Sequence, residues 1–340
     1  GMASAYTGIP QGIYAQLAST LNRTQARSLS PARAPTGTPL RLRVRIRDTG
    51  PALQETLASL AAQSRRADHV DVDEHPWPIG DHVPSAQAWT LLLCAGDTLE
   101  PHALEALARA VLEHPDPAGL RLLYWDHDER LPDGSLRNPV FKPGPLPDYL
   151  LSLPYMARAL LVRDDWARPW LATDLPHDEL ALAYRLMLEA LADGPRHVLH
   201  LPMPLLHLGG QPAAMLADTS ASWQALATEL SRHLARHAPG SIVQEGPGAG
   251  PFHVVHPLPR APKVSIVIPT RDQLPLLSRC IESVLDKTDY PDFELIIVDN
   301  DSQTAEARAF LAGLAGVDHE RIRVLPIPGP FNFSRMNNAA

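Results

Sequence analysis

The chain has 340 residues, of which 45% are hydrophobic and 20% charged, so roughly two domains with apolar cores can form. The formal net charge of -8 argues against nucleic acid as a partner, because binding to phosphates needs an excess of basic side chains. Every apolar run is shorter than the roughly 20 residues that span a bilayer, and the first residues lack the basic-then-apolar order of a secretion signal. Cys94 and Cys280 lack the CxxC spacing of a zinc site, and we expect both to be buried.

Residues 1–40 are rich in Ser, Thr, Ala and Pro, and we expect an N-terminal segment and linker there, with a possible short helix over 13–21. Residues 41–260 are predicted to form a first domain. Alternating or continuous apolar residues predict its strands, and apolar residues at helical spacing predict its helices. We expect strands at 42–47, 89–94, 120–125 and 198–201, and helices after Leu53, from Pro101 and over 179–191. The Pro- and Gly-rich residues 239–262 are expected to connect the two domains.

The second predicted domain covers residues 263–340 and has a more regular pattern. Its predicted strands lie at 264–268, 294–298 and 321–325, and its predicted helices lie at about 274–284 and 305–314. Strands alternating with helices predict parallel βαβ units in a doubly wound α/β sheet. Such sheets bind ligands beyond the carboxyl ends of their strands. Pro269 cannot donate to a neighbouring strand, so we expect it to end the first strand of this domain.

A faint internal repeat relates the two domains. Arg47, Asp48 and Pro51 match Arg271, Asp272 and Pro275 at one constant offset, which suggests two copies of one domain type. Chance similarity is the alternative for so few identities. Only about fifteen residues separate Asp73, at the end of the second predicted strand, from the strand that begins near Trp89. The first copy is therefore expected to be degenerate and to lack one helix–strand unit of the second copy.

Three segments of the second domain carry a family resemblance: VSIVIPTRD at 264–272, LIIVDNDS at 295–302 and FNFSRMNNAA at 331–340. In this order and spacing they resemble the opening strand, the second strand with its turn, and the segment before the metal-binding strand of family 2 glycosyltransferases. The resemblance implies a Rossmann-like GT-A fold in both copies. The metal-binding strand of the second copy would follow residue 340. We therefore expect a piece of a longer enzyme, truncated at its C-terminus and inactive by itself.

By this resemblance, Asp299 holds the uracil or ribose edge of a UDP- or dTDP-sugar, because a carboxylate accepts hydrogen bonds from imide N–H and hydroxyl groups. Thr270, Arg271, Asp272 and Asp301 are expected in the same nucleotide site. The alternative is that Asp299 and Asp301 only cap the following helix. The literal DxD formed by Asp299 and Asp301 is not taken as the metal motif, which the family carries on its fourth strand.

The first copy contains counterparts of the metal-binding segments. LLLCAGDTL at 91–99 resembles the metal-motif strand, although Asp97 is its only acid, and His207 resembles a late metal-ligand histidine. The resemblance implies a divalent cation, Mn²⁺ or Mg²⁺. A hard cation needs several oxygen ligands, so we expect weak or no binding at Asp97 and His207. For His207 the alternative is an ordinary hydrogen-bonded histidine.

Residues 124–151 contain three segments that resemble an acceptor-side stretch of bacterial polysaccharide and O-antigen assembly members of the family. Asp126, Asp128 and Glu129 are the implied acceptor-side acids, and a solvated loop is the alternative. Asp178 stands where the family has its catalytic base, and the alternative is an N-cap of the helix that follows.

The resemblance implies an inverting transferase that moves a sugar from a nucleotide sugar to a carbohydrate or lipid-linked acceptor in cell-surface polysaccharide assembly. Inversion needs one carboxylate base, and a cation neutralises the leaving diphosphate. The alternative function is a non-catalytic glycan-binding or structural module. It is favoured for the first copy because Asp97 is the only acid in the segment that resembles the metal motif. We expect a cytoplasmic protein, peripheral at the inner face of the membrane if the acceptor is lipid-linked. The exposed sheet edge at Val264 predicts dimerisation of this fragment.

Overall fold

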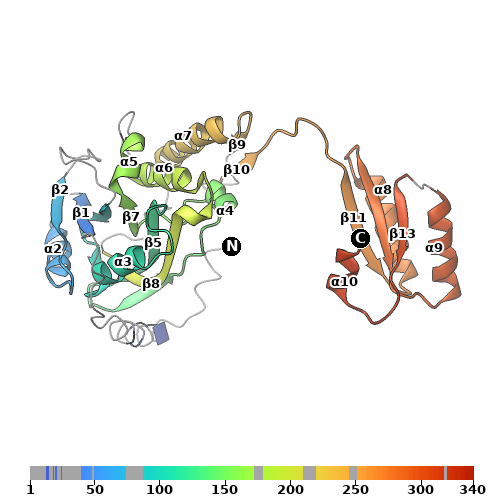
Figure 1. Cartoon of the computed structure of the whole chain (residues 1–340), viewed down its shortest axis with the longest axis horizontal. Coiled ribbons are helices and arrows are strands. Elements are labelled where there is room, and N and C mark those ends of the chain that lie inside the picture. The colour runs from blue at the N-terminus through green and yellow to red at the C-terminus, as the bar shows by residue number, and fades with distance from the viewer. Residues whose placement is uncertain are drawn as a thin grey trace. The chain divides into compact units, whose positions relative to one another are not determined.

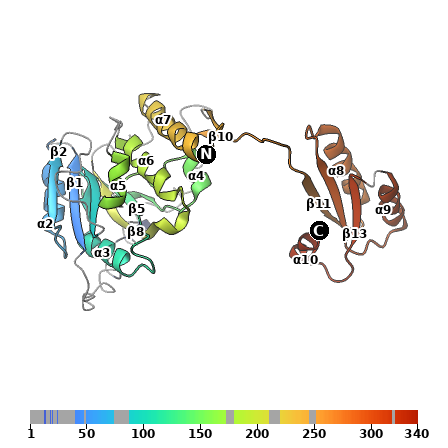
Figure 2. The same ribbon diagram turned by 45° about the horizontal axis from the view of Figure 1, so that its top comes forward.

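The computed structural model describes residues 13–14, 18, 20, 24, 40–47, 50–73, 87–171, 179–209, 220–244, 251–317 and 320–340. The chain divides into two compact units, Gly1–His256 and Pro257–Ala340, which are shown in Figures 1 and 2. The division follows directly after the last strand within the expected connection at 239–262. None of the described helices has both the length and the apolar composition that crossing a membrane requires.

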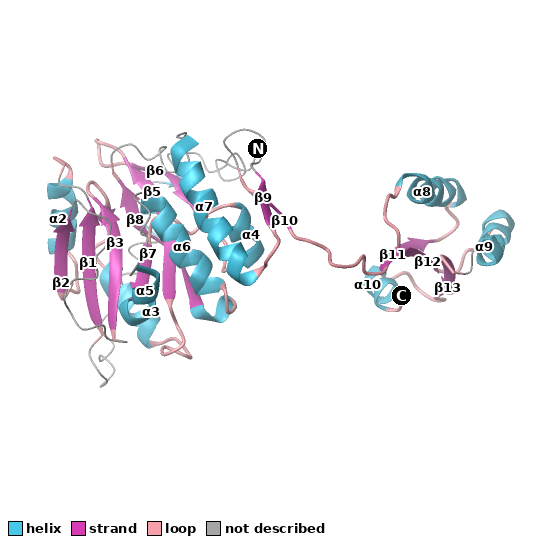
Figure 3. Cartoon of the chain, turned by 90° about the horizontal axis from the view of Figure 1, so that it is seen from above, coloured by secondary structure: helices cyan, strands magenta, loops and turns pink. Residues whose placement is uncertain are grey.

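The N-terminal unit is an eight-stranded sheet between two layers of helices, as Figure 3 shows. Its strands are β1 (Arg41–Arg47), β2 (His69–Asp73), β3 (Ala88–Cys94), β4 (Thr98–Leu99), β5 (Leu122–Arg130), β6 (Leu136–Val140), β7 (Leu160–Arg163) and β8 (Val198–Leu208). Its helices are α2 (Leu53–Ala61), α3 (Ala103–Leu112), α4 (Pro147–Ser152), α5 (Asp164–Leu171), α6 (Glu179–Leu191) and α7 (Ser220–His237). A short 3-10 turn, η1 (Pro195–His197), joins α6 to β8.

The strand order is β2-β1-β3-β7-β5-β8-β4, and β6 pairs with β5. β1, β2 and β3 are parallel, β7 runs antiparallel between β3 and β5, and β8 is parallel to β5. The carboxyl ends of β1, β3, β5 and β8 therefore lie at one edge of the sheet. The expected α/β class is confirmed, but the sheet is mixed rather than parallel. The sequence did not indicate this, because an apolar run predicts a strand and not its direction.

Helices pack on both faces because neighbouring side chains of a strand point to opposite faces. In β5, Leu122 and Tyr124 lie in the apolar cluster with α4, α5, α6 and α7. Leu123 and Trp125 lie in the cluster with α3, and the side chains of α2 pack against that same cluster. All four side chains are fully buried, so β5 contributes to the core on each face of the sheet.

Several N-terminal expectations need correction. β5 continues to Arg130 and β8 to Leu208, well past the predicted ends at 125 and 201. The connection at 239–262 contains an antiparallel pair of strands, β9 (Ile242–Gln244) and β10 (His253–Val255). The short helix expected over 13–21 agrees with the residues described there, because Tyr14 and Ala18 are helical, and both are buried. Cys94 is half-buried and Cys280 is exposed, so the prediction that both cysteines are buried is wrong.

The C-terminal unit is a parallel three-stranded sheet in the order β11 (Val264–Thr270), β12 (Phe293–Asp299) and β13 (Ile322–Pro326). α8 (Leu274–Lys287) and α9 (Ala305–Val317) pack on one face, and α10 (Phe333–Asn338) lies on the other (Figure 3). The predicted βαβ units are confirmed. Pro269 does not end β11, because β11 is an edge strand and an edge strand tolerates a residue without an N–H group.

The two units begin with the same arrangement. β1 and β2 are parallel with α2 between them, and β11 and β12 are parallel with α8 between them. The last pairs in register are Arg47 with Asp73 and Thr270 with Asp299, so each aspartate lies at the carboxyl end of the second strand of its unit. β3 flanks β1 on the side away from β2, whereas among the described residues no strand flanks β11 on that side. This arrangement agrees with the proposed internal repeat.

Candidate functional sites

The first candidate site lies at the carboxyl ends of β11 and β12. Thr270 and Asp299 are partners in register on these neighbouring parallel strands. The backbone N–H of Asn300 donates to the carbonyl oxygen of Thr270 at 3.0 Å, which keeps the two loops that follow side by side. This is the edge at which parallel sheets bind ligands.

The carboxylates of this edge make different contacts. Oδ1 of Asp299 accepts from the backbone N–H of Ser302 at 3.1 Å and from its hydroxyl at 2.6 Å. Oδ1 of Asp272 accepts from the backbone N–H groups of Gln303 at 2.6 Å and Thr304 at 2.8 Å, directly before α9. The hydrogen bond from Thr304 holds the pKa of Asp272 below its usual value. The N-cap of α9 is Thr304, whose Oγ1 accepts from the backbone N–H of Ala307 at 3.3 Å, so the alternative that Asp299 and Asp301 cap the helix is wrong.

Asp301 links the second loop to a third loop that follows β13. Its Oδ2 accepts from the backbone N–H of Gly329 at 3.2 Å, and Asp301 has a left-handed φ of 59°. The buried Asn300 donates from Nδ2 to the carbonyl oxygens of Ile327 at 2.9 Å and Gly329 at 3.0 Å. The sequence analysis did not single out Asn300 or Ser302, although both stand within the DNDS motif that it quoted.

The five residues expected to contact a nucleotide are thus brought to one edge. Arg271 and Asp301 are exposed, while Thr270, Asp272 and Asp299 are half-buried. A carboxylate there can accept from an imide N–H or a ribose hydroxyl, and a guanidinium can pair with a diphosphate. The edge therefore has the donors and acceptors that a nucleoside diphosphate requires.

The second candidate site is a row of buried, hydrogen-bonded polar side chains in the N-terminal unit. His207 on β8 is 0% exposed, and it contacts Asp128 on β5 through Nδ1 at 2.5 Å and Glu100 through Nε2 at 2.9 Å. The phenol of Tyr14 donates to Oδ2 of Asp128 at 2.7 Å. The sequence analysis missed Tyr14 and Glu100, because neither is near β5 or β8 in sequence and only folding brings them together.

The two carboxylates determine the charge of His207. Burial by itself lowers the pKa of His207, but the hydrogen bonds and negative charges of Asp128 and Glu100 outweigh it, and the pKa is raised. The imidazole is thereby stabilised in its protonated form, in which both ring nitrogens are donors. Because Asp128 and Glu100 occupy both ring nitrogens of His207, this arrangement does not fit His207 as a ligand of a divalent cation.

Asp97, the other expected metal ligand, is 1% exposed and forms an ion pair with Arg158. Its Oδ2 also accepts from the backbone N–H of Cys94 at 3.0 Å. Both oxygens of Asp97 are thus engaged, one by Arg158 and the other by the backbone, whereas a hard cation needs several oxygen ligands. The residues present at this place therefore do not fit the divalent cation that the resemblance implies. Arg158 was not anticipated, because it lies in an irregular segment with a left-handed φ of 60°.

The acids expected on the acceptor side lie within or at the end of the long strand β5. Asp126 is buried, and its Oδ1 accepts from the backbone N–H of Lys142 at 2.9 Å and contacts Nε2 of His200 at 2.9 Å. Asp128 is buried as described, whereas the half-buried Glu129 pairs with Arg137. The solvated-loop alternative is wrong for Asp126 and Asp128.

The expected catalytic base, Asp178, lies outside the described residues, as does its neighbour His177. The helix expected to follow them is present as α6, which begins at Glu179. The helix-cap alternative for Asp178 therefore stays open.

Comparison with known proteins adds a family and relatives. Residues 265–340 match the family described as glycosyl transferase family 2. The chain is 34% identical over 263 residues to the uncharacterized protein y4gI of Sinorhizobium fredii and 35% identical over 251 residues to the O-antigen biosynthesis protein RfbC of Myxococcus xanthus. These alignments cover 74% and 73% of the chain but only 28% and 19% of the relatives' lengths. A crystal structure of S. aureus TarS 1-349 in complex with UDP is similar with a TM-score of 0.35 and 14% identity, over 59% of this chain and 73% of that one.

Proposed function

We propose that this chain, whose residues 265–340 belong to glycosyl transferase family 2, is part of an enzyme that transfers a sugar to a carbohydrate or lipid-linked acceptor in cell-surface polysaccharide assembly. The similarity to an O-antigen biosynthesis protein supports this process. The alignments cover only 28% and 19% of the lengths of these two relatives. The sugar-transfer activity is therefore proposed for the whole protein and not for this chain alone.

One observation carries the assignment of the donor site: Thr270 and Asp299 are partners in register at the carboxyl ends of β11 and β12. The contacts of Asp299 with Ser302 both use Oδ1, and they fix the direction of the carboxylate. We assign Asp299 to the uracil or thymine imide or to the ribose hydroxyls of a UDP- or dTDP-sugar. Arg271, exposed beside it, would then pair with the diphosphate.

The proposed transfer proceeds with inversion at the sugar carbon. An acceptor hydroxyl loses its proton to a carboxylate base while its oxygen attacks the sugar carbon and the nucleoside diphosphate leaves. In this chain, the C-terminal unit binds and orients the donor. A divalent cation would stabilise the leaving diphosphate when bound, but Asp97 and His207 do not fit as its ligands, so no step is assigned to them.

A second role is proposed for the N-terminal unit, that of a non-catalytic structural or glycan-binding module. It is supported by the contacts of the family-like acids: Asp97 is paired with Arg158, and Asp128 with His207 and Tyr14. Charged groups satisfied by buried partners stabilise a fold rather than a reacting substrate. Sugar transfer by residues 1–340 that is abolished by Asp178→Ala would contradict this role.

Calorimetric titration with UDP and dTDP, with ADP as the comparison nucleotide, tests the donor site. Asp299→Asn preserves Oδ1 as an acceptor for Ser302 and removes the charge. We expect it to weaken UDP or dTDP binding about tenfold or more, because a hydrogen bond to a charged group contributes about 1.5 kcal/mol or more. Asp286→Asn, an exposed acid on α8, is the matched control and should bind like the unmodified chain. Equal affinity of Asp299→Asn and the unmodified chain would overturn the assignment.

We further propose a cytoplasmic location, at the inner face of the membrane if the acceptor is lipid-linked. The chain contains only two cysteines, Cys94 and Cys280, and this sparse use of cysteine fits a reducing compartment. Fractionation of cells that express the full-length protein, before and after a high-salt wash of the membranes, tests this location.

A further inference from the structure

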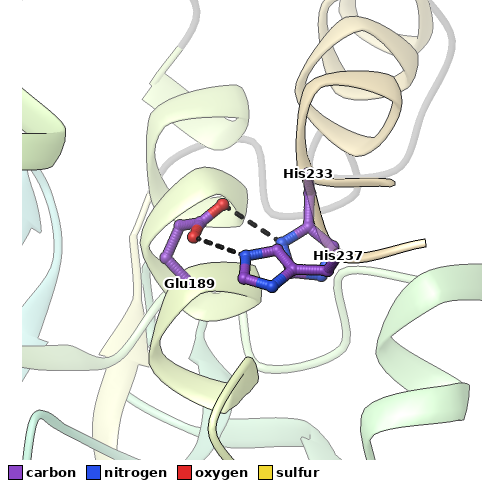
Figure 4. Close-up of side chains that lie close together, drawn as sticks. All are labelled: Glu189, His233 and His237. Atoms are coloured by element: carbon purple, nitrogen blue, oxygen red, sulfur yellow. Dashed lines mark hydrogen bonds and ion pairs between the residues drawn. The ribbon is translucent and has the colours of Figure 1, made fainter. Parts of the chain in front are cut away.

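Two helices of the N-terminal unit bring together three side chains that can bind a metal. Glu189 projects from α6, and His233 and His237 project from α7 (Figure 4). Nδ1 of His233 lies 3.1 Å from Oε1 of Glu189, and Nε2 of His237 lies 3.3 Å from Oε2. Within the described part of the chain, this is the group of three His, Cys, Asp or Glu side chains with the geometry of a metal site.

The spacing within α7 explains why both histidines reach Glu189. Residues four apart in a helix lie on one face, one turn above the other. The ring centroids of His233 and His237 are accordingly 4.5 Å apart. Glu189 lies in the last turns of α6, and α6 packs along α7, so one carboxylate faces both rings.

The distances match a metal centre. Zinc binds histidine nitrogen at about 2.0–2.1 Å and carboxylate oxygen at about 2.0–2.2 Å in tetrahedral geometry, which places adjacent ligand atoms roughly 3.3 Å apart. The distance from Nε2 of His237 to Oε2 of Glu189, 3.3 Å, is close to that value, and the ligand atoms of the three residues all lie within 4.8 Å of one another. An ion could therefore replace the hydrogen bonds with little movement of the helices.

The accessibility and the chemistry of the ligands are also suitable. His237 is 39% exposed, which gives an ion a route from solvent, whereas Glu189 is only 2% exposed. Nitrogen and oxygen ligands together suit zinc and its neighbours in the first transition series better than Mg²⁺ or Ca²⁺.

Arg236 is a cation that competes with a metal ion for the carboxylate of Glu189. It pairs with Oε1 of Glu189 at 2.5 Å and lies over the ring of Trp170 at 5.0 Å from its centroid. A carboxylate can bind a metal through one oxygen and retain an arginine on the other, as outer-shell partners do in many metal sites. Oε2, which faces His237, is the oxygen available for the ion in that arrangement.

The geometry points to a structural zinc-type site formed by Glu189, His233 and His237, with water as the fourth ligand. Its place argues for a structural role. Glu189 lies near the end of α6, which leads through η1 into the amino end of β8, away from the carboxyl ends where His207 lies. An ion there would join α6 to α7 and stabilise the helical layer of the N-terminal unit.

The test is a calorimetric titration of the EDTA-treated chain with Zn²⁺, together with the visible spectrum of the Co²⁺ form. We expect one tight equivalent of zinc, a tetrahedral Co²⁺ spectrum and a higher unfolding temperature with zinc. His237→Ala should weaken binding at this site by at least about 10- to 100-fold, the loss caused by removing even an outer-shell partner. Because His237 is partly exposed, this variant is expected to fold, which circular dichroism checks.

Two further variants complete the experiment. His253→Ala, an exposed histidine on β10, is the matched control and should bind zinc like the unmodified chain. Glu189→Gln preserves the shape of the buried side chain and should lose the tight equivalent as well. The inference is overturned if the unmodified chain binds no tight equivalent, or if His237→Ala and His253→Ala bind zinc with the same affinity. Neither result depends on sugar transfer or nucleotide binding, so this inference and the proposed function fail separately.

Discussion

Asp128 and His207 are joined by a hydrogen bond of 2.5 Å between Oδ1 and Nδ1, and both side chains are fully buried. The family resemblance places them in two different roles, on the acceptor side and at a metal. The structure instead joins them across the β5–β8 pair, where Tyr14 contacts Asp128 and Glu100 contacts His207. Four polar side chains from distant parts of the sequence thus satisfy one another.

Removal of Asp128 should destabilise the N-terminal unit strongly. Asp128→Ala leaves the buried, protonated His207 without its nearest counter-charge, and breaking a buried pair in this way costs about 3–5 kcal/mol of unfolding free energy. Glu129→Ala removes contacts with the partly exposed Arg137 and the exposed Asn138 and should cost about 1 kcal/mol or less. Urea unfolding of the two variants measures the difference, and equal losses would contradict the role of Asp128.

The His207 contacts should make stability depend on pH. The folded-state pKa of His207 is raised, so its contribution is fully present below the unfolded value of about 6.5 and is lost as pH rises through the folded pKa. The unfolding free energies of the unmodified chain and of His207→Gln should therefore converge as pH rises above about 6.5. Urea titrations across this range measure the gap, and a gap that widens with pH would show the opposite sign.

The buried ion pair between α6 and α7 should be sensitive to loss of one partner. Arg185 donates to Glu229 from Nε at 2.7 Å and from a terminal nitrogen at 2.9 Å. Arg185→Met leaves Glu229 buried without this partner and should cost about 3–5 kcal/mol. The double variant Arg185→Met/Glu229→Leu should recover much of that loss, because it buries no unpaired charge. A double-mutant cycle by chemical denaturation decides this, and a double variant no more stable than the single one would contradict it.

Asp272 should protect the turn that precedes α9. Its Oδ1 accepts from the backbone N–H groups of Gln303 and Thr304, so Asp272→Ala exposes both amides to solvent. We expect faster hydrogen exchange at these two amides, measured by NMR or mass spectrometry. Asp286→Ala on α8 should leave their exchange unchanged. Unchanged exchange in Asp272→Ala would mean that the hydrogen bonds of Asp272 do not protect this turn.

The edge strand β11 should associate with another copy of the chain. Val264 is 41% exposed and most of β11 is half-buried, which is the kind of edge that pairs with other strands. Light scattering should show dimers that increase with concentration, and Val264→Lys should reduce them, because charge on an edge strand opposes pairing. A chain that is monomeric at every concentration would contradict this prediction.

The sequence by itself determined the C-terminal unit closely. Apolar runs of five residues and helical spacing are local signals, and β12 and α8 were found at nearly their full extent. The same signals placed Thr270 and Asp299 at the ends of neighbouring strands, because parallel strands joined by a helix must end at the same edge. The candidate nucleotide site was therefore predictable from sequence, apart from Asn300 and Ser302, which connect its loops.

The tertiary structure alone decided the buried polar groups of the N-terminal unit. The residues after Trp125 are polar and give no strand pattern, yet β5 continues through Asp126 and Asp128, since His200, His207 and Lys142 satisfy their carboxylates. The metal-type cluster has the same origin. The two histidines four residues apart were visible in the sequence, but Glu189 is 44 residues before His233 and meets it only because α6 packs on α7. Local periodicity encodes which residues face a core, whereas the pairing of charges between distant segments exists only once the chain is folded.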